Sequence, residues 1–157
     1  MSPRYIQSPQ DLERLRVKRV LKCEIYSRMQ PLPLYGARVS AGFPSPADDF
    51  VEDSLDLNEL LIRHPAATFF VRVQGDSMVD AGIHSGDILI VDRALEPWNR
   101  AVVVAVLNGE LIVKRIRQKG EKVFLEPENH EYPSIEVTSD VAFRIWGVVI
   151  HVIHSLT

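Results

Sequence analysis

A serine near the middle of the chain and a lysine in its second half are of the types that can together cleave a peptide bond. Ser77 lies in the segment Gly75-Asp76-Ser77-Met78, directly after an apolar run that predicts a strand. Such a turn can expose a hydroxyl beside backbone N–H groups, which would stabilise the oxyanion formed when a carbonyl is attacked. By itself this is weak evidence, because serine is common in turns. The Gly-x-Ser-x-Gly elbow of α/β-hydrolases is absent, since Val79 occupies its last position.

Lys114 could act as the base for such a serine. It lies in a predicted strand over 110–117, where alternation places Ile112, Lys114 and Ile116 on one face. Burial disfavours the charged ammonium and lowers a lysine's pKa, by up to about 3 to 5 units when burial is complete. The alternative is a lysine that reaches water from the strand edge. Periodicity does not measure burial, so both interpretations stay open here.

The remaining reactive side chains suggest no further site. None of the five histidines has a spacing typical of a catalytic triad or a metal-ligand set, and we expect them to be structural or surface residues: His64, His84, His130, His151 and His154. His151 and His154 would lie on opposite faces if the last strand continues. The single cysteine, Cys23, excludes an internal disulfide. We therefore expect no metal and no cofactor.

The elements that must position these residues are mostly strands. Asp56 is expected to cap a short helix through Ile62 that His64-Pro65 ends. After it come short apolar, β-branched runs: Thr68–Val73, Ile88–Val91, Ala101–Leu107, Leu111–Ile116, Lys122–Leu125, Ile135–Val137 and Ala142–Ile150. Asn108-Gly109 predicts a tight hairpin turn. No strand alternates with a long helix, so the fold class should be mainly β and antiparallel.

The N-terminal part differs in composition. Ser8, followed by Pro9, predicts a helix start, and apolar residues at near-helical spacing extend a helix over about 9–28. The segment Pro31–Pro46 holds four prolines and two glycines, which predicts an extended linker. Residues 1–41 carry a net charge of +5, while the whole chain carries -3, which leaves -8 on the remainder. This basic arm could bind nucleic acid, an acidic protein or its own body, or be a solvated surface.

Composition limits the class of protein. The chain has 157 residues, of which 46% are hydrophobic and 25% charged, as in an ordinary globular domain. No apolar run approaches the roughly 20 residues of a membrane helix, and the N-terminus has no signal-peptide layout. We therefore expect a cytoplasmic protein without a membrane partner.

Several ordered segments together resemble the LexA/UmuD family of self-cleaving peptidases, and the UmuD branch in particular. They are Ala41–Ala47, Asp56–Leu61, Gly75–Met78, Gly86–Asp92, Gly109–Arg115 and Gly147–Val152. The intervals also suit UmuD, since Lys114 follows Ser77 by 37 positions and Gly42 precedes it by 35. The resemblance implies a LexA/UmuD-type β-fold body with an extended N-terminal arm.

The resemblance also implies roles for individual residues. Ser77 would be the nucleophile and Lys114 the neutral general base, and the backbone amides of Asp76 and Ser77 would form the oxyanion hole. The cut would fall between Ala41 and Gly42, with Val39 as an apolar anchor of the cleaved segment. Self-cleavage would thus divide the chain into a regulatory arm, residues 1–41, and a peptidase domain, residues 42–157.

The resemblance further implies a homodimer that is cut in response to DNA damage. A filament of RecA on single-stranded DNA would promote the cut, and the shortened form would serve a UmuC-like translesion polymerase as accessory subunit. Residues 1 to about 17 have no counterpart in UmuD, and 41 residues with one helix are too few for the DNA-binding domain of a LexA repressor. We therefore expect no direct sequence-specific DNA binding.

Three alternatives stay open. The chain could be a non-catalytic module that binds the polymerase or RecA, or a LexA-like repressor fragment that lacks its DNA-binding domain. It could also be a peptidase that acts on other proteins, like signal peptidase, which shares Ser/Lys chemistry but needs a membrane anchor.

Overall fold

The computed structural model describes residues 15–22, 32–35 and 51–157. Its internal contacts divide the chain into two compact units, one of Met1–Cys23 with Ala66–Thr157, the other of Glu24–Pro65. No helix among the described residues is long and apolar enough to cross a membrane.

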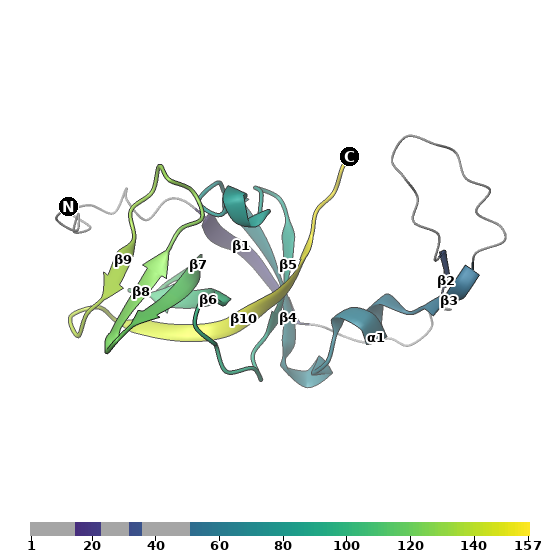
Figure 1. Ribbon diagram of the computed structural model, residues 1–157, viewed down its shortest axis with the longest axis horizontal. Helices are drawn as coiled ribbons and strands as arrows, with labels where there is room; N and C mark the ends of the chain where they lie inside the picture. The colour runs from purple at the N-terminus through teal and green to yellow at the C-terminus, as the bar shows by residue number, and fades with distance from the viewer. Residues whose placement is uncertain (1–14, 23–31, 36–50) are drawn as a thin grey trace. The chain divides into compact units, whose positions relative to one another are not determined.

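The first unit is an antiparallel sheet of eight strands (Figure 1). The strands are β1 (Leu15–Lys22), β4 (Thr68–Gly75), β5 (Ile88–Asp92), β6 (Val102–Leu107), β7 (Glu110–Lys119), β8 (Lys122–Glu126), β9 (Ile135–Val137) and β10 (Phe143–Ile153). Their order across the sheet is β1-β4-β5-β10-β6-β7-β8-β9, and β1 also pairs with β7, so the sheet closes on itself. The predicted mainly β class is confirmed.

The strands predicted from residue 68 onward are confirmed within a few residues at each end. The turn at Asn108-Gly109 joins β6 to β7, and both residues have positive φ, 49° and 85°. This conformation suits a two-residue hairpin, because its twist matches that of the flanking strands. The long strand β10 pairs with β6 through its first half and with β5 through its second half.

The helix predicted over 9–28 is wrong where the structure describes it, because residues 15–22 form the strand β1. A register shift between Val17 and Arg19 explains the error. It inserts one residue, so Val17 and Val20, three positions apart, both pack against the same core cluster. In a strand with a bulge, apolar residues therefore recur at a spacing that is otherwise typical of a helix. The rest of the predicted helix lies outside the described residues.

The second unit contains a two-stranded antiparallel ribbon and a short helix. The ribbon pairs β2 (Leu32–Tyr35) with β3 (Val51–Leu55), so the predicted linker is wrong over 32–35, and the rest of the linker lies outside the described residues. Proline is tolerated in β2 because a two-stranded ribbon consists of edge strands only. The helix α1 (Leu57–Leu61) follows, and the Asp56 carboxylate accepts a hydrogen bond from the Asn58 N–H at 2.8 Å, so the predicted cap is confirmed.

The core of the first unit fixes the serine turn. One cluster of buried residues includes Val71 and Val73 of β4, Val113 of β7, and Met78, which directly follows the serine. Met78 is completely buried. Because the residue beside Ser77 is packed into the core, the turn that carries the hydroxyl cannot swing away without opening a cavity.

Candidate active site

Ser77 and Lys114 lie in direct contact. The Nζ atom of Lys114 is hydrogen-bonded to Oγ of Ser77 at 2.7 Å. Ser77 comes from the turn after β4 and Lys114 from the middle of β7, where its cross-strand neighbour is Val103 of β6. The two residues are 37 positions apart in the sequence, and the closed sheet brings them together.

The pair is dry. Ser77 is 0% exposed and Lys114 is 7% exposed. No carboxylate among the described residues forms an ion pair with Lys114. Burial, without a compensating negative charge, lowers the pKa of the Lys114 amine from 10.5 to about 8. An appreciable fraction of this amine is therefore uncharged near neutral pH, and only the uncharged amine can accept a proton.

The backbone around Ser77 offers donors. In the part of the chain that the structure describes, no group accepts a hydrogen bond from the N–H of Asp76 or of Ser77. The Ser77 carbonyl, in contrast, is occupied, since it accepts a hydrogen bond from the Glu128 N–H at 2.9 Å. Free backbone N–H donors next to the nucleophile are one requirement of an oxyanion site.

A segment that the sequence analysis did not single out holds this turn. It follows β8, and three of its residues contact the turn or its neighbours: Glu128, Asn129 and Tyr132. Asn129 donates from its amide nitrogen to the Asp76 carbonyl at 3.0 Å, and the Tyr132 hydroxyl donates to the Asp76 carboxylate. The Glu128 carboxylate accepts a hydrogen bond from the guanidinium of Arg115, which directly follows Lys114 in β7. The lysine strand and the serine turn are thus braced by the same segment.

Residues 33–150 match the family described as Peptidase S24-like. The chain belongs to this family. It is 48% identical to the protein SamA of Salmonella typhimurium strain LT2 over 123 residues, and these aligned residues make up 78% of this chain and 85% of SamA. It is 44% identical over 126 residues to the protein MucA of Escherichia coli, covering 80% and 86%. The LexA repressor of Shewanella piezotolerans is 42% identical over 125 residues, which cover 79% of this chain and 60% of that repressor.

These similarities confirm the resemblance to UmuD-like proteins of the LexA/UmuD family. The Peptidase S24-like match contains Ser77 and Lys114, and also the predicted cleavage pair Ala41-Gly42. It excludes β1, which precedes residue 33. Val39, Ala41 and Gly42 lie outside the described residues, so their positions relative to the serine stay predictions.

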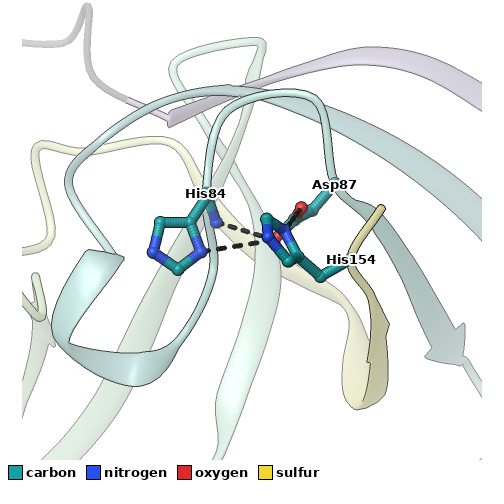
Figure 2. A group of neighbouring side chains, drawn as sticks. All are labelled: His84, Asp87 and His154. Carbon is teal, nitrogen blue, oxygen red and sulfur yellow. Dashed lines mark hydrogen bonds and ion pairs between the residues drawn. The ribbon is translucent and has the colours of Figure 1, made fainter. Parts of the chain in front are cut away.

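A second polar cluster, absent from the sequence analysis, lies elsewhere in the first unit, and one of its three residues follows the end of the Peptidase S24-like match. His84, Asp87 and His154 offer ligand atoms that all lie within 4.8 Å of one another (Figure 2). The histidine nearest to Ser77 in sequence, His84, thus belongs to this cluster. The signal that could have found it is strand pairing, because Ile153 of β10 pairs with Ile88 of β5 and so brings the next residues, His154 and Asp87, together.

Proposed function

We propose that this chain is a self-cleaving serine peptidase in which Ser77 and Lys114 cut the bond between Ala41 and Gly42. The observation that carries the proposal is the buried 2.7 Å contact between the Ser77 hydroxyl and the Lys114 amine. Serine is a weak nucleophile until a neighbouring base takes its proton, and an uncharged amine in direct contact is such a base. The family membership supports the same chemistry.

The proposed reaction proceeds in two stages. The neutral Lys114 amine takes the Ser77 proton while Oγ forms a bond to the Ala41 carbonyl carbon, and the backbone N–H groups of Asp76 and Ser77 stabilise the resulting oxyanion. When this intermediate collapses, the bond to the Gly42 nitrogen breaks and the Lys114 ammonium returns its proton to that nitrogen. Water, deprotonated by the same amine, then hydrolyses the ester at Ser77.

The small residues of the cleaved segment suit this proposal. Glycine lets the backbone of the cleaved segment approach the serine closely, and Val39 would share a face with Ala41 and anchor the segment. A hydroxyl with no exposed surface can be reached only when the groups around it move. We therefore propose that self-cleavage is slow because only a small fraction of the chains has its cleavage segment docked at Ser77. Because bond and nucleophile share one chain or one dimer, their effective concentration is high.

Cleavage would also change the surface of the body. The released arm, residues 1–41, carries +5 and includes β1, and the remaining 42–157 carry -8. β1 pairs with β4 from Leu15 to Lys22, so its departure would leave the edge of β4 without a partner. An unpaired strand edge is a ready template for another chain. Release of the arm would thus expose a new binding surface.

We further propose that this surface serves the response to DNA damage. The resemblance to UmuD implies a homodimer, promotion of the cut by RecA filaments on single-stranded DNA, and a shortened form that assists a UmuC-like translesion polymerase. Similarity to MucA, SamA and the LexA repressor supports placing the chain in this system. The net charge of -8 on the shortened form argues against its direct binding to DNA.

The test is to incubate the purified chain with and without RecA, ATP and single-stranded DNA, and to weigh the fragments. We expect two products, residues 1–41 and 42–157, formed faster when the filament is present. Ser77→Ala should stay intact, whereas Ser139→Ala, which changes an exposed turn serine, should be cut like the parent chain. A cut at another bond, or cleavage of Ser77→Ala at the parent rate, would refute the proposal.

A further inference from the structure

The cluster of His84, Asp87 and His154 joins two distant parts of the chain. His84 and Asp87 lie in the turn before β5, and His154 directly follows β10, 67 positions after Asp87. In Figure 2 both imidazole rings lie beside the Asp87 carboxylate, and dashed lines connect each histidine to it. The cluster contains neither member of the Ser77–Lys114 pair.

The carboxylate at the centre is held firmly. Asp87 is 3% exposed, and its Oδ2 accepts a hydrogen bond from the His84 backbone N–H at 2.8 Å. The Asp87 backbone is also bonded on both sides, its N–H to the His84 carbonyl at 3.1 Å and its carbonyl to the Val73 N–H at 3.0 Å. The other oxygen, Oδ1, lies 2.6 Å from Nδ1 of His154. One oxygen ligand is therefore fixed in place before any ion arrives.

The two imidazoles are placed differently. His84 is 51% exposed and His154 is 47% exposed, so one side of each ring faces solvent. Their ring centroids are 5.1 Å apart, and Nδ1 of His84 lies 3.8 Å from Oδ2 of Asp87. Both rings can thus turn by small movements without disturbing the core, and an ion can reach them from solution.

We propose that these three residues bind a divalent ion of the zinc class. Two imidazole nitrogens and one carboxylate oxygen are the ligand types that Zn²⁺ prefers, and three protein ligands leave a fourth position for water. Around a tetrahedral zinc, with bonds of about 2.0 to 2.2 Å, ligand atoms are separated by about 3.3 Å. The three ligand atoms lie within 4.8 Å of one another, and the closest pair is 2.6 Å apart. Adjustments of about an ångström would accommodate the ion, which would replace the proton between His154 and Asp87.

Such an ion would fasten the segment that follows β10 to the turn before β5. Residues 155–157 follow His154 and are exposed. His154 lies beyond residue 150, where the Peptidase S24-like match ends. The turn on the other side of the ion continues to Ser85, whose hydroxyl accepts a hydrogen bond from the Gly75 N–H at 3.3 Å. The site therefore connects the segment after β10 to the turn that is hydrogen-bonded to Gly75, at the end of β4.

The test titrates the untagged chain, residues 1–157, with Zn²⁺ against a chromophoric chelator. We expect one ion per chain, and we expect His84→Ala and His154→Ala each to weaken the affinity by at least about tenfold. The matched controls are His130→Ala and His151→Ala, which remove exposed histidines outside the cluster and should leave the affinity unchanged. Both cluster histidines are half-exposed, so their alanine variants should fold, and far-UV circular dichroism checks this.

Two further measurements separate a built site from casual binding. Co²⁺ in place of Zn²⁺ should give the visible absorption of a tetrahedral ion in the parent chain and lose it in His154→Ala. Zn²⁺ should slow the release of Thr157 by carboxypeptidase in the parent chain but not in His154→Ala. Equal affinity in parent and His154→Ala, or an equal loss in the control variants, would overturn the proposal and leave a hydrogen-bonded cluster only. The result is independent of self-cleavage, because all three ligands lie on the same side of residue 42.

Discussion

The Ser77–Lys114 pair and the cluster of His84, Asp87 and His154 each contain a buried ionisable group, but the surroundings of the two groups differ. Lys114 is buried beside a neutral hydroxyl with no carboxylate partner among the described residues, and burial lowers its pKa. Asp87 is buried as deeply, but it is bonded to a backbone N–H and to an imidazole. The first arrangement favours loss of charge and leaves a reactive lone pair. The second keeps polar partners around the group and leaves a preformed ligand.

The placement of the two clusters follows the same division. Lys114 comes from the middle of β7, where it pairs with Val103 of β6 and is buried, so the amine has little freedom. The cluster histidines come from a surface turn and from the residue after a strand end, where side chains are half in water. The proposed reactive pair thus lies on rigid elements shielded from solvent, and the proposed ion site lies on accessible ones.

The largest effect should come from removing the amine. Lys114→Ala deletes the proposed base and should slow self-cleavage by about 100- to 10,000-fold, the usual contribution of a positioned general base. Lys119→Ala is the matched control, because it removes an exposed lysine from the same strand. Fragment yield over time measures both. An unchanged rate of self-cleavage in Lys114→Ala would show that the Lys114 amine is buried but is not the base.

The cost of burying the amine should be visible in stability. The folded pKa of about 8 lies below the unfolded value of 10.5, so between these values the unfolded chain binds more protons and stability rises with pH. Below pH 8 the full penalty applies, about 3 kcal/mol at about 1.4 kcal/mol per pKa unit. Relative to Lys114→Met, the parent should therefore gain about 3 kcal/mol in unfolding free energy between pH 7 and about pH 10.5.

This difference is measured by denaturant unfolding of both proteins in a Ser77→Ala background, which keeps the chains intact. Groups that titrate in both proteins cancel from the comparison. Lys119→Met, in the same strand but exposed, should show no such pH-dependent gap. A constant gap between parent and Lys114→Met across this range would mean that the amine is not desolvated.

The rate of self-cleavage should follow the neutral amine. Below pH 8 the uncharged fraction rises about tenfold per pH unit, and it levels off above about pH 9. The fraction of chains with a docked cleavage segment scales the cleavage rate by the same factor at every pH, provided that docking involves no titrating group. Cleavage measured from pH 6 to 10 without RecA should thus rise and then plateau, with a midpoint near 8. A midpoint near 10.5 would show that the Lys114 amine is solvated. The serine–lysine pair would then be open to water, as the two histidines of the other cluster are.

Much of the fold from residue 68 onward could be predicted because apolar, β-branched runs mark buried strands. The failures have physical causes. The bulge in β1 sets Val17 and Val20 three positions apart, and Pro33 made a paired strand resemble a linker. For the site, alternation placed Lys114 between two isoleucines, but its burial and its contact with Ser77 depend on the closing of the sheet. The His84 cluster depends on the pairing of β5 with β10, which no local pattern encodes.

The smallest effect concerns the brace around the serine turn. Asn129→Ala removes the exposed hydrogen bond to the Asp76 carbonyl and should slow cleavage about twofold to tenfold, since such a bond contributes about 0.5 to 1.5 kcal/mol. The pH midpoint should stay near 8, because the amine remains buried, while the plateau falls. Asn99→Ala is the control, since it also removes a bond to a backbone group, the Gln118 N–H, away from the serine. If both variants lowered the plateau rate equally, Asn129 would act only through the stability of the fold. If Asn129→Ala instead shifted the pH midpoint of cleavage, water would enter the site, and the burial of the Ser77–Lys114 pair would depend on the Asn129 hydrogen bond.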